Sequence, residues 1–320
     1  AGTLRAGSAT AFGSNSAVTA NATLDLNGFD ISIGSLTGGG TVTNSTTATA
    51  TLITGGNNLL RTFSGVIQDG SGITQLTKIG TGKQSLSGTN TYTGATTVEA
   101  GTLRVTVAGV LGSGLYSGAI AISDGASFDY LSSAAQTLSG DVSGAGALTK
   151  DVSAASTLTL SGTNTYTGAT TVSAGTLRAG STTAFGSNSA VTTNGTLDLN
   201  GFDISVGSLA GSGTVSSSTV TTRTLTSGGD NTSTTFSGVI QNGSGITRFS
   251  KTGTGTQTLS GNNTYTGATT VSAGALTLEG AWSVGTGMAD VAVAAGSVLS
   301  GSGTLTAGQL SVGGLGTVSL

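Results

Sequence analysis

Short runs of alternating apolar and polar residues fill most of this 320-residue chain. Leu24 and Leu26 form one such run, and Phe29, Ile31 and Ile33 form the next. Alternation with a period of two predicts β-strands with one buried face. Helices are not expected as the main element, because glycine and threonine are unfavourable in helices and the chain holds 56 glycines. The pattern therefore predicts an all-β protein.

Tight corners are predicted between these strands. Asn27-Gly28 separates the two runs above, and Asn200-Gly201 stands at the same place in a second copy of the segment. Asparagine and glycine tolerate the positive φ that a tight corner requires. We therefore expect all four residues to form corners.

One block of sequence occurs three times. It reads LSGTNTYTGATTV from Leu86 and from Leu160, and LSGNNTYTGATTV from Leu259. The offsets are 74 and 99 residues, close to three and four multiples of a unit of about 25 residues, which lies in the range of solenoid repeats. We expect the block to recur every few coils of one winding. A two-residue insertion between Leu148 and Leu160 should bulge outward at a corner.

The block belongs to a longer unit. Residues 1–100 and 174–273 are two copies of this unit, residues 101–173 are a more divergent copy, and residues 274–320 continue the strand pattern. Neither proline nor a change in composition marks a linker, which argues against a chain of β-sandwiches of about 100 residues each. The sequence predicts that residues 1–320 form one continuous β-solenoid of roughly 13 coils.

Low charge restricts the possible partners. Charged residues make up 7% of the chain and the net charge is −3, so no basic field is available for nucleic acid or an anionic membrane. No stretch approaches the about 20 apolar residues of a membrane helix, and there is no cysteine for disulfides or thiolate metal sites. The composition fits a secreted bacterial surface protein. Since the opening segment from Ala1 recurs inside the second copy, we expect a mature piece of a longer protein.

The sequence offers few residues for catalysis. Histidine is absent, and no serine stands in a nucleophile motif with a histidine or lysine partner. Glu99 is replaced by serine in the other copies. Only aspartates could serve a hydrolase or a weak Ca²⁺ site, and we expect Asp25, Asp30 and their counterparts Asp198 and Asp203 to be surface carboxylates beside the corners. No catalytic residue, cofactor or metal is therefore predicted.

Three lysines and three arginines recur between the copies. We expect them on exposed strand surface, where positive charge deters edge-to-edge pairing; a binding role is the alternative. These residues are Lys78, Lys150 and Lys251, and Arg5, Arg104 and Arg178.

The asparagine and tyrosine of the NTYTG segment are candidates for stacked rows in the winding. Asparagine side chains can form hydrogen-bonded ladders where like residues stack. Exposed tyrosines that contact carbohydrate are the alternative. Threonine-rich stretches also suggest an ice-binding face, but their Thr-x-Thr pairs do not recur at the expected coil spacing. The ladder candidates are Asn90, Tyr92, Asn164, Tyr166, Asn263 and Tyr265.

The three blocks share the consensus LTKxGxGxxxLSGxNTYTGATTVxAGTL, over Leu76–Leu103, Leu148–Leu177 and Phe249–Leu276. This consensus resembles the passenger-associated transport repeat, the autotransporter-associated β-strand repeat of bacterial type V secreted proteins. The resemblance implies a right-handed parallel β-helix at the cell surface, exported through an outer-membrane barrel. The family includes adhesins, aggregation factors and proteins with appended enzymes, so the repeat alone does not choose a function.

We therefore expect a non-enzymatic structural β-solenoid of the bacterial cell surface. It would act as an adhesin stalk or as an extracellular fibre subunit able to stack end to end. The expected partners are other copies of the chain, surface glycans or neighbouring cells, with no nucleic acid and no membrane span in this segment. The alternatives are a polysaccharide-acting β-helix enzyme and a Ca²⁺-dependent glycan-binding module.

Overall fold

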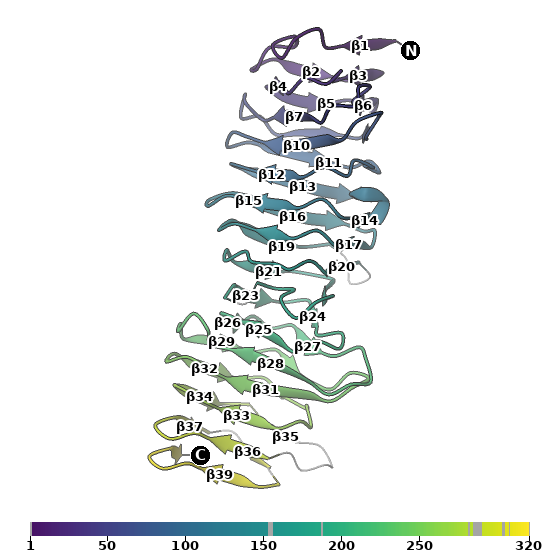
Figure 1. Cartoon of the computed structure of the whole chain (residues 1–320). Helices are drawn as coiled ribbons and strands as arrows, with labels where there is room; N and C mark the ends of the chain where they lie inside the picture. The colour runs from purple at the N-terminus through teal and green to yellow at the C-terminus, as the bar shows by residue number, and fades with distance from the viewer. Residues whose placement is uncertain are drawn as a thin grey trace. The chain divides into compact units, whose positions relative to one another are not determined.

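Short parallel strands stack into columns in the computed structural model (Figure 1). The structure describes residues 2–152, 156–186, 188–280, 282–283, 290–302, 305–306 and 308–319. Every strand pair resolved among them is parallel, with partners that come from successive turns of the chain. The chain is a parallel β-solenoid of about 14 turns, which confirms the all-β solenoid prediction.

The chain divides into two compact units, Ala1–Gly168 and Ala169–Leu320. In the first unit the strands form three columns joined by corners, and a short 3₁₀ turn covers Gly112–Gly114. One column holds β4 (Ile31–Ile33), β7 (Ala50–Thr54), β10 (Thr74–Lys78), β12 (Thr96–Val98), β15 (Ile120–Ile122) and β18 (Val142–Ser143). The next holds β2 (Ala17–Thr19) and β5 (Ser35–Thr37), then β8 (Arg61–Phe63), β11 (Lys83–Leu86), β13 (Thr102–Val107), β16 (Ser127–Ser132) and β19 (Ala147–Lys150). The third holds β1 (Thr3–Arg5), β3 (Thr23–Asp25), β6 (Thr41–Thr43) and β9 (Val66–Ile67), then β14 (Leu115–Tyr116), β17 (Gln136–Leu138) and β20 (Thr157–Leu160).

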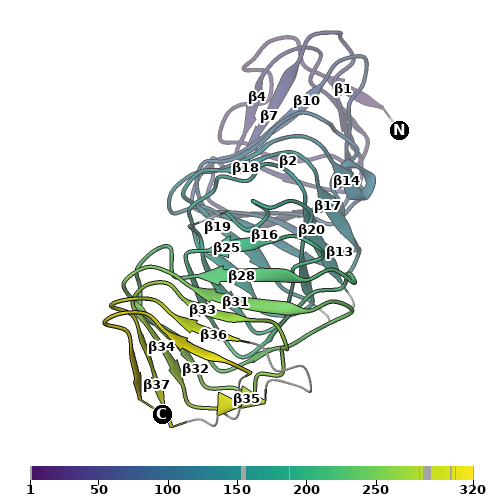
Figure 2. The same ribbon diagram turned by 60° about the horizontal axis from the view of Figure 1, so that its bottom comes forward.

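The second unit is built in the same way. Figure 2 shows β28, β31, β33 and β36 side by side in one of its sheets, which also contains β25 and β39. This sheet runs through β25 (Ile204–Val206), β28 (Arg223–Ser227), β31 (Thr247–Lys251), β33 (Thr269–Val271), β36 (Val291–Val293) and β39 (Leu310–Val312). A second runs through β29 (Thr234–Phe236), β32 (Thr256–Leu259), β34 (Ala275–Leu278), β37 (Val298–Gly301) and β40 (Thr317–Ser319). The others are β22 (Thr176–Ala179), β24 (Thr196–Asp198), β27 (Thr214–Ser216) and β30 (Val239–Ile240); β21 (Thr170–Val172), β23 (Ala190–Thr193) and β26 (Ser208–Ala210); and β35 (Trp282–Ser283) with β38 (Leu305–Thr306).

The length of a turn varies. Leu24 pairs with Val42, 18 residues later, whereas Val42 pairs with Ile67, 25 residues later. The predicted constant unit of about 25 residues is therefore wrong, because the corners carry loops of different length.

This variation moves the second copy of the block to another face of the winding. In the first copy β10 lies in the column of β7 and β12. The corresponding strand of the second copy, β19, lies in the column of β16 and β13 instead. The 74-residue offset is thus not a whole number of turns, contrary to the prediction.

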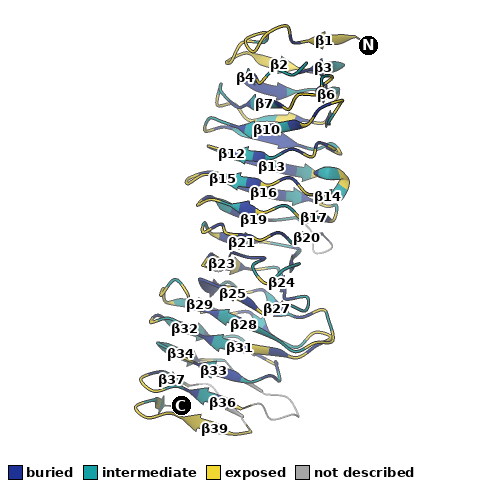
Figure 3. Cartoon of the chain, in the orientation of Figure 1, coloured by how far each residue is buried: buried dark blue, intermediate teal, exposed yellow. Residues whose placement is uncertain are grey.

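Alternation along the strands decides which side chains form the core. Leu24, Leu26, Ile31 and Ile33 are buried, as the pattern predicts, while Phe29 is half-buried. Figure 3 shows buried positions within strands such as β12 and β16, and mostly exposed loops at the outer corners.

Glycine columns form at one set of corners. A Cβ on Gly65 would lie well inside van der Waals distance of the carbonyl oxygen of Gly40, one turn earlier, and a Cβ on Gly88 would meet that of Gly65. The second unit repeats the arrangement with Gly213, Gly238, Gly261 and Gly280. Only glycine lets the backbones of successive turns approach this closely.

The Asn-Gly corners have left-handed backbone geometry. The φ angles are 51° and 80° at Asn27 and Gly28, and 45° and 84° at Asn200 and Gly201. The bulge predicted for the second copy falls largely on residues 153–155, which lie outside the described residues.

Candidate functional site

The recurring lysines lie inside the winding. Lys78 ends β10 and is fully buried, and its ammonium donates hydrogen bonds to the carbonyl oxygens of Ile79 (2.7 Å), Gly80 (2.8 Å) and Ala100 (3.1 Å). The chain turns sharply here, with φ 69° at Gly80, and these carbonyls point inward. The prediction that Lys78 is exposed is therefore wrong, because the corner carbonyls need its donors.

Lys251 occupies the same position in the second unit. Its ammonium donates to the carbonyl oxygens of Thr252, Gly253 (2.9 Å) and Ala273 (3.3 Å), and the side chain is 1% exposed. The prediction of an exposed lysine is wrong here too, for the same reason.

Lys150 is also buried, which corrects the third lysine prediction. Its ammonium donates to the carbonyl oxygen of Val152 (3.1 Å) and lies 5.9 Å from the centre of the Tyr130 ring, within cation–π range. Burial lowers the pKa of all three lysines, and that of Lys78 falls to about 8. The nearby Asp151 and Asp230 oppose this pKa shift at Lys150 and Lys251 respectively.

The asparagines of the NTYTG segments bond to strand ends. The Asn90 side chain accepts a hydrogen bond from the backbone N–H of Ile67 (3.0 Å) and donates to the carbonyl oxygens of Gly88 (3.0 Å) and Val110 (3.2 Å). Strand β9, which contains Ile67, is the last strand of its four-stranded sheet, before β14 continues the column. The Asn90 amide thus supplies the acceptor that a further strand would have supplied.

The other two asparagines make the same bond. Asn164 accepts from the N–H of Val142 (2.7 Å) and Asn263 accepts from that of Ile240 (2.8 Å). All three asparagines are buried. Their predicted role in holding the register of the winding stays a prediction.

Three glutamines that the sequence analysis missed also replace backbone groups. The Gln84 side chain accepts from the N–H of Leu36 (3.2 Å) and donates to its carbonyl oxygen (3.0 Å), although the two residues are 48 positions apart. Gln136 pairs with the backbone of Leu111 in the same way, at 2.8 and 3.1 Å. Gln257 donates to the carbonyl oxygen of Leu209 at 3.0 Å.

A sequence signal for these glutamines exists. Each one opens a Gln-Ser/Thr-Leu-Ser-Gly motif, starting at Gln84, Gln136 and Gln257. A polar residue recurring two positions before a buried leucine predicts a buried amide, because the strand period places both on one face.

The tyrosines of the NTYTG segments are enclosed. Tyr92, Tyr166 and Tyr265 have no exposed surface, so none of these rings is available to contact carbohydrate. The Tyr92 hydroxyl lies 2.8 Å from the Thr96 hydroxyl, and its ring meets Tyr116 edge-on with 5.4 Å between the centroids. Burial raises the pKa of Tyr92 to about 12, despite the hydrogen bonds that act in the opposite direction, and raises that of Tyr265 further.

This burial predicts a loss of stability in alkali. The unfolded chain releases tyrosine protons near pH 10, whereas folded Tyr92 holds its proton to about pH 12. The free energy of unfolding should therefore fall as the pH rises between these values, by about 3 kcal/mol for Tyr92 alone. Urea denaturation across this range should show the fall, and a shallower one in Tyr92→Phe. An equal slope in both proteins would contradict the prediction.

The recurring arginines pair with aspartates in the adjacent turn. Arg5 Nε lies 2.8 Å from Asp25 Oδ2, and Asp25 Oδ1 accepts from the backbone N–H groups of Asn27 (2.9 Å) and Ser45 (3.0 Å). Asp25 is 1% exposed. Burial acts to raise the pKa of Asp25, but the bonds from Ser45, Asn27 and Arg5 together hold it below its usual value.

The same clamp occurs in the second unit. Asp198 bonds to Arg178 Nε (2.8 Å) and to the N–H groups of Asn200 (2.9 Å) and Ser218 (2.9 Å). Arg104 and Asp129 form a third pair at 2.8 Å. The predictions of surface carboxylates at positions 25 and 198 are therefore wrong. Arg5 is exposed, as predicted, whereas Arg104 and Arg178 are half-buried.

The remaining aspartates near the corners accept hydrogen bonds from the backbone. Asp30 and Asp203 are exposed, and each accepts a hydrogen bond from a backbone N–H in the next turn, that of Thr51 (2.7 Å) or Thr224 (2.8 Å). No group of three or more acidic side chains that could hold a metal ion occurs in the described part of the chain.

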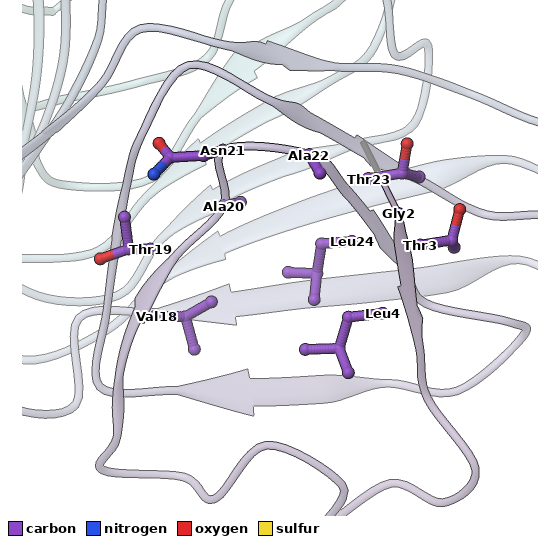
Figure 4. Close-up of a pocket in the computed structure, with 10 residues that line it drawn as sticks. All are labelled: Gly2, Thr3, Leu4, Val18, Thr19, Ala20, Asn21, Ala22, Thr23 and Leu24. Carbon is purple, nitrogen blue, oxygen red and sulfur yellow. The ribbon is translucent and has the colours of Figure 1, made fainter.

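A hollow of about 320 Å³ lies within the first turns of the winding. Figure 4 shows Leu4, Val18 and Leu24 between the strands that enclose it. Its other lining residues are glycine, alanine, threonine and asparagine, without a charged side chain among them. The hollow can take apolar groups and offers no residue for acid–base chemistry.

The profile of the passenger-associated transport repeat matches the chain at residues 76–105, 155–179 and 249–278. The chain carries three of these repeats. They contain the buried Lys78 and Lys251 and the three NTYTG segments, so each repeat places polar side chains in the interior of the winding.

One similar protein is the adhesin BmaC autotransporter of Brucella suis biovar 1 (strain 1330). It is 45% identical over 109 residues, which cover 32% of this chain and 3% of that protein. No solved structure matches the chain. The repeats and the autotransporter relative both indicate a secreted protein of the cell surface.

The described residues contain no helix of the length and apolarity needed to cross a membrane.

Proposed function

We propose that this chain is a non-enzymatic structural segment of a bacterial surface adhesin, a stalk that carries adhesive parts. One observation carries the proposal: the polar side chains that recur between repeats bond to the backbone of the winding. The lysines bond to corner carbonyls, and the asparagines to strand ends. The recurrent chemistry therefore holds the scaffold together.

The adhesin name of the relative supports the same function. The shared stretch is only 3% of that protein, so adhesion by the whole molecule is part of the proposal. A parallel β-solenoid suits a stalk, because each turn hydrogen-bonds to the turns on either side and the structure extends by repetition.

A screen of the purified chain against polysaccharides tests the proposal against an enzyme. We expect no turnover of any polymer. Turnover that is abolished by Asp198→Asn, and retained in Asp124→Asn as the control, would show that the chain is a polysaccharide-acting enzyme.

Stacking of copies end to end is the finer part of the proposal. A solenoid presents parallel strands at its ends, and a head-to-tail contact between such ends would not close, so it would give filaments. Electron microscopy of the purified chain at rising concentration should then show filaments. Single particles at every concentration would contradict the stacking and leave the stalk function intact.

A further inference from the structure

Four Asn-Gly pairs occur in the chain, at Asn27, Asn194, Asn200 and Asn242. Such pairs can deamidate without an enzyme. The backbone nitrogen of the glycine attacks the side-chain carbonyl carbon of the asparagine and gives up its proton to solvent. A C–N bond forms, ammonia leaves, and water then opens the cyclic imide to aspartate or isoaspartate. The rate depends on how free the glycine nitrogen is to reach the carbonyl carbon.

Three of the four glycine nitrogens are held by acceptors. Gly28 N–H donates to the Asn44 side-chain oxygen (2.9 Å), Gly195 N–H to the carbonyl oxygen of Val172 (3.0 Å), and Gly243 N–H to that of Gly245 (3.2 Å). Each of these hydrogen bonds must break before the nitrogen can attack. Gly201 N–H has no hydrogen-bond partner among the described residues.

The difference between Gly28 and Gly201 comes from one substitution between the copies. Asn44 holds Gly28, and the residue at the corresponding place in the second unit is Ser217. The Ser217 hydroxyl bonds to Thr219 (3.4 Å) and does not reach Gly201.

The Asn200 carbonyl is also polarised. Ser218 Oγ donates to Asn200 Oδ1 at 3.2 Å. A donor at this oxygen stabilises the negative charge that develops there when the glycine nitrogen attacks. Asn200 is half-buried, at the corner between β24 and β25, so water has access for the second step.

We propose that Asn200–Gly201 is the preferred deamidation site of the chain. The product loses the Asn200 amide donor, which bonds to the carbonyl oxygen of Ala179 in the previous turn (2.8 Å), and gains a carboxylate next to Asp198. Deamidation thus weakens the link between β22 and β24 and adds one negative charge to the second unit.

Peptide mapping by mass spectrometry after incubation at mildly alkaline pH tests this proposal. The other three Asn-Gly pairs are internal controls in the same molecule. We expect Asn200 to deamidate about fivefold faster than Asn27, which corresponds to one hydrogen bond of the usual net strength. In denaturant the four rates should converge, because the hydrogen bonds are then lost.

A reciprocal exchange identifies the cause. Ser217→Asn supplies the acceptor that Asn44 gives in the first unit and should slow deamidation at Asn200 about fivefold, whereas Asn44→Ser should speed it at Asn27 by a similar factor. If Asn44→Ser perturbs the fold, the deamidation rate of Asn200 in Ser217→Asn is sufficient to test the proposal. Equal rates at the four sites of the folded protein, or an unchanged Asn200 rate in Ser217→Asn, would overturn the proposal.

Discussion

Gly65→Ala is expected to lower the free energy of unfolding by about 3 kcal/mol or more. The added methyl group would overlap the carbonyl oxygen of Gly40 and lie 2.6 Å from Cζ of the Phe63 ring, which is fully buried. Neither the backbone of the preceding turn nor the enclosed ring can move without disturbing the parallel pairing above and below. Chemical denaturation followed by circular dichroism measures the loss.

Gly39→Ala is the matched control. Gly39 lies in the same unit and is exposed, and its nearest neighbour for a Cβ is Ser64 Oγ at 3.5 Å, an ordinary contact. We expect a change within about 0.5 kcal/mol. Equal losses in the two variants would mean that the glycine columns do not limit how closely the turns approach.

Lys78→Met is expected to destabilise the protein by about 3 kcal/mol, although methionine fits the volume. The variant leaves the carbonyl oxygens of Ile79, Gly80 and Ala100 without the donor that they share. Each buried acceptor that loses its partner costs about 1 to 3 kcal/mol, partly offset because the charge no longer has to be buried.

Lys83→Met serves as the control for loss of a positive charge. Lys83 is half-buried at the start of β11, and its replacement should change the free energy of unfolding by about 0.5 kcal/mol at most. If Lys78→Met were as stable as Lys83→Met, the corner carbonyls would not depend on the lysine ammonium as their hydrogen-bond donor.

Strand alternation predicted the apolar core, and the same alternation places the lysines on the buried face. Lys78 follows Leu76 by two residues, and Lys251 follows Phe249 by two, so the period places each lysine on the buried face. The general preference of lysine for the surface led to the opposite prediction. The inward carbonyls that reverse this preference are formed by the corner backbone, which no local pattern reveals.

The prediction that Asp25 and Asp198 are surface carboxylates was wrong for another reason. Alternation places Asp25 on the outer face, between Leu24 and Leu26. Its burial comes from Arg5 in the adjacent turn and from the Ser45 amide. Such neighbours follow from the register, and the register depends on turn lengths that vary between 18 and 25 residues. Sequence spacing alone therefore could not predict which residues lie next to Asp25.

The shift of the second repeat to another face bears on recognition of the surface. Strands β10 and β19 have corresponding sequences but belong to different sheets of the first unit, so their outward residues, such as Thr77 and Thr149, face in different directions. An antibody raised against the shared sequence would meet its two epitopes on separate sides of the winding. The two arms of one antibody could bind both epitopes at once only by reaching two different faces of the winding. Avidity should therefore be lower than for identical epitopes on one face.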